Sequence, residues 1–205
     1  EDGQFLSAET TVVVSVQGGP PESAKNVLFV ANLPTNQSDT NIASRLTNMG
    51  HNLELIDDDV VASADGIGKD LIIISSTVLS SKVNTKFTNS SLPVLVWESA
   101  LFDDLALTGF NKNIDWGTQS NQQSISITDT GPLSAGLSGN VQIAASNQLI
   151  RWGNPSSGAM FTSTVVGDAS KATIFSYEVG APMLGMTAPG RRVGFFFTDS
   201  IGETW

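Results

Sequence analysis

The run Val27-Leu28-Phe29-Val30-Ala31 decides the fold class, because it is apolar at every position rather than at alternate positions. A strand with this pattern is buried on both faces, as the strands of parallel sheets are. Leu71-Ile72-Ile73-Ile74 and Pro93-Val94-Leu95-Val96-Trp97 repeat the pattern. The three runs predict the core strands of a parallel sheet.

The segment after the first run predicts a crossover helix. Ile42, Leu46 and Met49 follow one another at intervals of four and three, so they share one helix face. Asp39 is placed to cap the start of this helix, and Gly50 to end it.

Further segments continue the alternation of strands and helices. A second strand is predicted over residues 53–56 and a short helical segment around residues 83–87, which suits right-handed crossovers in a parallel sheet. The second half instead favours antiparallel strands over 124–127, 141–143, 160–166 and 172–177, with a hairpin loop at 167–170 and a last buried strand over 192–197. The sheet is therefore expected to be mixed.

The first 20 residues differ from the rest. The run at 10–16 is rich in β-branched residues and predicts a strand, and Gly18-Gly19-Pro20-Pro21 has the composition of a linker. Residues 2–16 resemble the closing strands of immunoglobulin-like repeat modules, so residues 1–20 are interpreted as the end of a preceding module. The alternative is an edge strand of the main domain, which spans residues 26–205.

Charge and composition exclude several functional classes. The 205 residues carry 10 basic and 20 acidic side chains, a net charge of −10, which argues against nucleic acid and anionic membranes as partners. The chain has no cysteine and one histidine, so thiolate nucleophiles, thiolate zinc sites and multi-histidine metal sites within the chain are excluded. No metal or cofactor is expected.

Two observations bear on location. No stretch approaches the roughly 20 apolar residues that a membrane span requires, so membrane insertion is not expected. Only 15% of the residues are charged, which is more typical of a protein secreted or displayed at a bacterial surface. The first residue is Glu1, which indicates a processed product or an excised fragment.

The order of elements from Lys25 to Trp205 resembles the class I glutamine amidotransferase-like superfamily, with ThuA-like domains and related modules of large secreted bacterial proteins as the nearest relatives. The resemblance implies an α/β fold, a flavodoxin-like three-layer sandwich with parallel strands first and antiparallel strands in the second half. The marker segments are 27–30, 69–77, 92–98, 128–137 and 190–197.

The chain departs from this family at the residues that perform its chemistry. The resemblance implies a cysteine at the turn after the fourth strand, where this chain has Glu98, and a histidine near Thr198 and Asp199, where it has none. Glutaminase chemistry needs a thiolate and an activating base. Amidotransferase activity is therefore not expected.

Polar residues are predicted to gather at the carboxyl ends of the strands, where doubly wound sheets bind ligands. Asp57–Asp59 are placed to bind a hard cation or to act as acids, but they also precede a short predicted helix over residues 60–62, where capping accounts for them. Glu98 is expected either to form a structural hydrogen bond to Ser75, Ser76, Thr77 or a backbone amide, or to act chemically. The candidate ligand-binding residues are Asn32, Asp57, Asp58, Ser75, Ser76, Glu98 and Thr198, and the candidate catalytic residues are Glu98 and Asp199.

Other features favour plainer interpretations. His51 is expected at the opposite edge of the sheet, in a solvent-facing loop. Gly66-Ile67-Gly68 precedes a strand, whereas a phosphate-binding loop follows one. Aromatic residues expected around the edge loops, with either a sugar-stacking or a packing role, are Trp97, Phe102, Phe110, Trp116 and Trp152.

Two functions are expected from these observations. The first is a non-catalytic binding or interaction module of a larger secreted or surface protein, with carbohydrate or neighbouring domains of the same polypeptide as partners. The alternative is a carbohydrate-directed enzyme that uses Glu98 with Asp57–Asp59 or Asp199.

Overall fold

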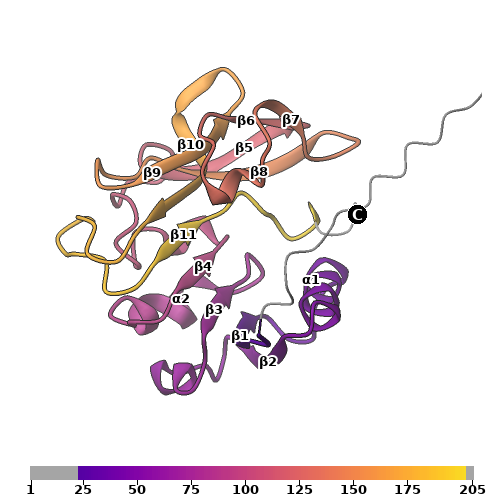
Figure 1. Cartoon of the computed structure of the whole chain (residues 1–205), viewed down its shortest axis with the longest axis vertical. Helices are drawn as coiled ribbons and strands as arrows, with labels where there is room; N and C mark the ends of the chain where they lie inside the picture. Colours follow the sequence, from indigo (N-terminus) through magenta and orange to yellow (C-terminus); the bar gives the residue numbers. More distant parts are fainter. Residues whose placement is uncertain (1–22, 202–205) are drawn as a thin grey trace, which may run out of the picture.

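The computed structural model describes residues 23–201, which form one mixed sheet with helices on both of its faces (Figure 1). The strand order is β2-β1-β3-β4-β11-β10-β9-β6-β7, and β5 pairs with β8, which pairs with β10. The predicted strand and linker of residues 1–20 lie outside the described residues. The strands are β1 (Asn26–Ala31), β2 (Asn52–Asp57), β3 (Leu71–Ile74), β4 (Val94–Val96), β5 (Trp116–Gln122), β6 (Ser124–Ile127), β7 (Gly139–Gln142), β8 (Gln148–Gly153), β9 (Met160–Val165), β10 (Asp168–Tyr177) and β11 (Arg192–Gly194).

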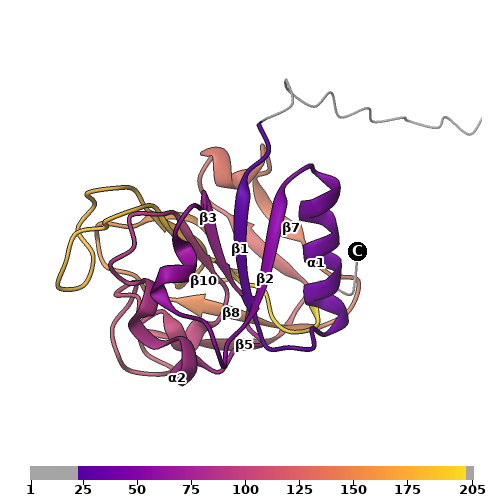
Figure 2. The same cartoon turned by 90° about the horizontal axis from the view of Figure 1, so that it is seen from below.

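Helices are few and short. Helix α1 (Gln37–Asn48) and helix α2 (Ser80–Val83) lie on opposite sides of the parallel strands (Figure 2). None of the helices within residues 23–201 is long and apolar enough to cross a membrane. The remaining helical turns are 3₁₀ helices at Ser63–Gly66, Asn84–Phe87, Ser99–Leu101 and Pro132–Ser134.

The parallel half of the sheet confirms the prediction from the apolar runs. β1 pairs in parallel with β2 and β3, β3 with β4, and β4 with β11. Val27 and Phe29 pack on the side of α1, whereas Leu28 and Val30 pack with Val83 and Phe87 on the side of α2. Continuous apolar runs were required because helices lie on both faces of these strands.

The antiparallel half begins where β11 pairs with β10. β10, β9, β6 and β7 then follow with antiparallel pairing, which confirms the mixed sheet. The predicted hairpin joins β9 to β10, but its turn is Val166-Gly167, where Gly167 has a φ of +82°. β5 and β8 were not predicted, because polar residues interrupt their alternation.

Three local predictions were wrong. Helix α1 begins earlier than expected, because Asn36 is the cap and its side chain accepts a bond from the Asp39 amide at 2.8 Å. Residues 58–60 form a turn in place of the short helix predicted at 60–62. The last strand ends at Gly194, three residues before its predicted end at residue 197.

Candidate functional site at the carboxyl edge of the sheet

The parallel strands end together at one edge of the sheet. The chain passes from β1 to β2 on one side and returns to β3 on the other, so the strand order reverses between β1 and β3. Such a reversal point is where open α/β sheets bind ligands. The residues that follow the strands at this edge are Asn32 after β1, Asp57 to Asp59 at the end of β2, Ser75 and Ser76 after β3, Glu98 after β4, and Thr198 and Asp199 beyond β11.

Glu98 is a buried carboxylate at the turn after β4. The residue is 7% exposed, and its Oε1 accepts a hydrogen bond from the Ala100 amide at 2.8 Å. The Arg151 guanidinium of β8 faces it at two points, with Nη1 3.2 Å from Oε1 and Nη2 3.0 Å from Oε2. Arg151 also donates to Ser99 Oγ and to the Ser76 carbonyl oxygen. Glu98 therefore connects the parallel half of the sheet to the β5–β8 ribbon.

Burial dominates the electrostatics of Glu98. Desolvation raises the pKa of the Glu98 carboxyl above its usual 4.5, and the Arg151 charge and the Ala100 amide oppose this rise only in part. The negative charge of Asp199 adds to the rise, and Lys112 reduces it. The two-point contact with Arg151 accordingly serves to hold a charge that the surroundings disfavour.

Asp39, rather than Glu98, binds the hydroxyl groups that follow β3. Ser75 Oγ and Thr77 Oγ1 each donate to the Asp39 carboxylate at 2.7 Å, and Trp97 Nε1 donates to Ser75 Oγ at 3.3 Å. The expectation that Ser75, Ser76 or Thr77 would bond to Glu98 was therefore wrong, although its backbone-amide alternative is met by Ala100. Burial raises the pKa of the Asp39 carboxyl above its usual value. The hydrogen bonds from Ser75 and Thr77 oppose this rise, and the negative charge of Asp199 adds to it.

Asp199 is the accessible carboxylate near this cluster. Its side chain is 59% exposed, and its Oδ1 lies 3.6 Å from Arg151 Nη2. Its carbonyl oxygen accepts a bond from Asn36 Nδ2 at 2.7 Å, which ties the segment after β11 to the start of α1. The preceding residue, Thr198, is buried and donates to the Leu149 carbonyl oxygen at 3.1 Å. Thr198 therefore has a structural bond rather than an open position.

The residues at the ends of β1 and β3 differ in exposure. Asn32 is exposed, and its amide donates to Thr77 Oγ1 at 3.2 Å. Ser76 is buried, and its hydroxyl has no hydrogen-bond partner among the residues that the structure describes. Ser75 and Ser76 thus sit inside the edge, whereas Asn32 and Asp199 face solvent.

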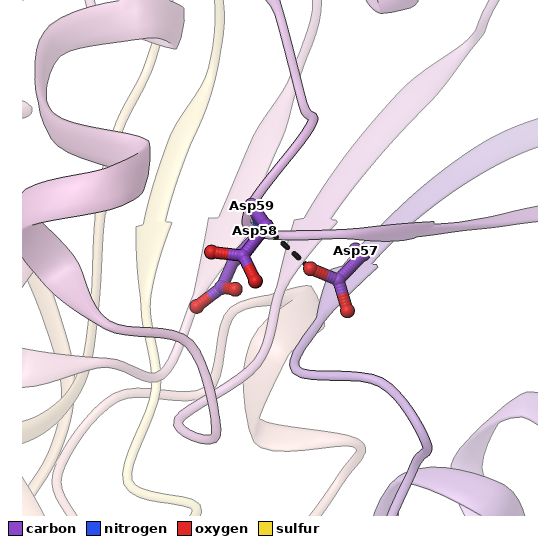
Figure 3. A group of neighbouring side chains, drawn as sticks. All are labelled: Asp57, Asp58 and Asp59. Atoms are coloured by element: carbon purple, nitrogen blue, oxygen red, sulfur yellow. Dashed lines mark hydrogen bonds between the residues drawn. The ribbon is translucent and has the colours of Figure 1, made fainter.

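Asp57, Asp58 and Asp59 lie on one turn after β2, with carboxylate oxygens within 4.8 Å of one another (Figure 3). Asp57 accepts bonds from the amides of Leu33 and Asp59, both at 2.8 Å, and these bonds lower its pKa. Asp58 is fully buried; it accepts a bond from the amide that precedes α2, and Lys82 Nζ lies 3.1 Å from it. Lys82 also contacts Asp59, so structural bonds account for the triplet, although the predicted helix is a turn.

The aromatic residues mostly pack inside the fold. Trp97, Trp152 and Phe102 are buried and Trp116 is half-buried, so the packing role is met for these four and sugar stacking is not. Phe110 is 73% exposed. A flat aromatic surface for stacking on a sugar is therefore not formed by these five residues.

His51 lies at the opposite edge of the sheet, as predicted. It precedes β2, and its Nδ1 accepts a long bond from the Lys25 amide at 3.4 Å. This position is remote from the carboxyl ends of the strands.

The sequence interpretation missed two residues that organise the site, Asp39 and Arg151. The sequence predicts Asp39 as a helix cap, and that role gives no indication of its burial. Arg151 lies in the apolar run Leu149-Ile150-Arg151-Trp152, and a lone cation in such a run indicates a buried partner. The sequence therefore indicates that Arg151 has a buried partner, but it does not indicate that this partner is Glu98.

Comparisons with known proteins agree with this architecture. No protein-family profile matches the chain, and no curated protein sequence matches it. A structure described as a GMP synthase component from Thermoplasma acidophilum superposes with a TM-score of 0.52 at 13% identity, covering 85% of each chain. A ThuA-like structure from Bacteroides uniformis gives 0.47 at 8% identity over 95% of this chain and 88% of that one. A glutamine amidotransferase from Thermotoga maritima gives 0.48 at 7% identity over 86% and 76%.

These likenesses concern the fold. The chain has a class I glutamine amidotransferase-like, flavodoxin-like fold, with parallel strands first and antiparallel strands later. Identities of this size carry no activity across to this chain, because one fold supports many unrelated sites.

Proposed function

We propose that this chain is a non-catalytic binding or interaction module of a larger secreted or surface bacterial protein, and that it does not hydrolyse glutamine. The observation that carries this proposal is the state of Glu98. At the turn where the family resemblance implies a nucleophile, the chain has a buried carboxylate bonded to Arg151 and to the Ala100 amide. A side chain held in this way has no free face toward a substrate.

A partly uncovered apolar hollow supports the interaction part of the proposal. Ile73, Leu95, Phe195 and Phe197 line a hollow of about 240 Å³ on the α1 side of the sheet. Apolar surfaces of this kind mark contact sites for other polypeptide. Secretion rests on the low content of charged residues, and carbohydrate remains one class of partner to test.

The experiment measures ammonia release from glutamine and, separately, binding of soluble polysaccharides by calorimetry. We expect ammonia at the level of the buffer blank. Ammonia release that disappears in Glu98→Ala would contradict the proposal. A polysaccharide that binds without release of reducing ends would supply the ligand.

One observation favours the alternative, a carboxylate enzyme that acts on carbohydrate. Asp199 is exposed and lies near Arg151, and the pKa of the adjoining Glu98 is raised, as general acids require. This alternative predicts that reducing ends are released from a polysaccharide and that Asp199→Asn abolishes their release.

A further inference from the structure

One face of the parallel sheet is only partly covered within residues 23–201. We define the sheet-face groove as the depression between Leu46 of α1, Ile73, Leu95, Phe195 and Leu133. It consists of the hollow of about 240 Å³ described above and a second hollow of about 210 Å³. Leu95 and Phe195 line both hollows, so the two are continuous.

The opposite face of the same strands, on the α2 side, is fully buried. Val94 and Val96 of β4 point to the α2 side and are buried, whereas Leu95 between them is only half-buried. Helix α1 packs beside β2. Beside β4 and β11, the second hollow is lined by Leu133 of the 3₁₀ turn Pro132–Ser134. Parallel sheets are normally covered on both faces, so this partly covered apolar face is suited to contact with further polypeptide.

The charge of the groove selects the kind of partner. Among the residues that line the two hollows, the charged ones are Arg45 and Arg191. The protein as a whole has a net charge of −10. The positive charge is therefore local to the groove, and a partner that is apolar on one side and carries acidic groups beside these two residues complements it.

We propose that the chain's own segment, residues 9–17, lies in the sheet-face groove as an extended strand. Val12, Val14 and Val16 alternate with Val13 and Ser15, so one side of an extended segment presents three valines. Residues 1–22 contain Glu1, Asp2, Glu9 and Glu22 and no basic residue, so their charge is opposite to that of the arginines at the groove, of which Arg191 also pairs with Glu178.

The described chain begins close enough for this segment to reach the groove. The Asn26 amide bonds to Asp70 at 2.8 Å, and Val27 pairs with Leu71, so β1 starts at the edge where the second hollow opens. β4 is two strand spacings from β1, about 10 Å. Residues 18–24 span up to about 23 Å when extended. The chain can thus cross to β4 and leave residues 9–17 along the strand direction, with Val16 nearest the exposed end of α1.

This inference rests on the proposed function, because it names the polypeptide that the apolar face contacts. If residues 1–20 are the end of a preceding module, the groove is the joint between that module and this domain.

Disulfide trapping provides the first test, since the chain has no cysteine of its own. We expect Val16→Cys combined with Met49→Cys to form an intramolecular disulfide under mild oxidation, because Met49 lies at the groove rim. The matched control is Ser15→Cys with Met49→Cys, in which the first cysteine faces away. Equal trapping in both pairs, or none in either, would overturn the proposal. Disulfide-linked dimers would show that a second copy fills the groove.

The second test compares the full chain with a chain that lacks residues 1–20. We expect the truncated chain to bind an apolar fluorescent dye severalfold more strongly and to melt several degrees lower. A synthetic peptide of residues 9–17 should reverse both changes. In the full chain, the double variant Val12→Asp with Val14→Asp should have the same effect as the deletion, because it places charge on the side that faces the groove. The control is Val13→Asp with Ser15→Asp, which adds the same charge to the opposite side and should leave dye binding and melting unchanged.

The outcomes separate this inference from the function on which it rests. Equal dye binding by the full and truncated chains would show that residues 1–20 leave the groove open, and would assign the face to a different molecule. That result would overturn the inference and leave the interaction module intact. Glutamine or polysaccharide turnover would overturn the module and leave the dye and trapping results unaffected.

Discussion

Glu98 and Arg151 are 53 residues apart and form a two-point ion pair, with Arg151 Nη2 3.0 Å from Glu98 Oε2 and Nη1 3.2 Å from Oε1. Their side chains are 9% and 14% exposed, so the pair is largely removed from water. It joins the turn after β4 to β8, and therefore joins the two halves of the sheet.

Removal of Glu98 should destabilise the fold. Glu98→Ala leaves Arg151 and the Ala100 amide without their main acceptor, and we expect a loss of about 3–5 kcal/mol. Glu98→Gln keeps an acceptor for these donors and should lose less. Glu54→Ala is the matched control, since Glu54 pairs with Lys69 at the surface and should change stability by about 1 kcal/mol or less. Urea unfolding of the three variants measures the difference. An unchanged midpoint in both Glu98 variants would argue for an open catalytic carboxyl.

Replacement by Met should destabilise the fold much more at Arg192 than at the adjacent Arg191. The Arg192 side chain is buried and donates to the carbonyl oxygens of Leu92, Thr88 and Ser90, and burial lowers its pKa to about 10. We expect Arg192→Met to cost about 3 kcal/mol or more, because several buried carbonyl groups lose their donor. Arg191→Met removes a surface pair with Glu178 and should cost less than about 1 kcal/mol. Thermal unfolding of both variants checks this; similar losses would contradict it.

Asp39 should make stability depend on pH. Burial raises the pKa of this carboxyl in the folded state, so the folded protein binds more protons than the unfolded chain between the unfolded pKa and the folded one. Its contribution to stability therefore falls as the pH rises through that window. Asp39→Asn removes the ionisation while keeping an acceptor for Ser75 or Thr77. Melting curves between about pH 4.5 and 7.5 should be flatter for the variant than for the wild type, and parallel curves would refute the assignment.

Gly194 is required by the ring of Phe175. A Cβ at position 194 would lie 2.3 Å from a ring carbon of Phe175, so Gly194→Ala should cost about 1–3 kcal/mol through overpacking. Combining it with Phe175→Leu should cost less than the sum of the two single changes, because the smaller side chain makes room. A double-mutant cycle by denaturant unfolding measures this coupling, and simple additivity would count against it.

The parallel half of the fold followed from the sequence because its signal is local. The runs at β1, β3 and β4 are apolar at consecutive positions, and helices on both faces impose that pattern. β5 and β8 were missed because each pairs mainly with the other at the side of the sheet, where polar residues such as Ser120 and Asn121 remain exposed. Strand propensity depends on such surroundings more than on the residues themselves.

For the candidate site, too, the sequence determined some features and only the tertiary structure determined the others. The sequence placed Glu98, Ser75 and Asp199 at the carboxyl ends of strands, since strand direction alone determines that edge. It also determined that no cysteine or second histidine is available. Only the tertiary structure decided that Arg151 faces Glu98 and that Asp39 binds Ser75 and Thr77. Those pairs join residues 53, 36 and 38 positions apart. Contacts of this kind arise from how the elements pack, and no local pattern of residue types specifies which donor meets which carboxylate.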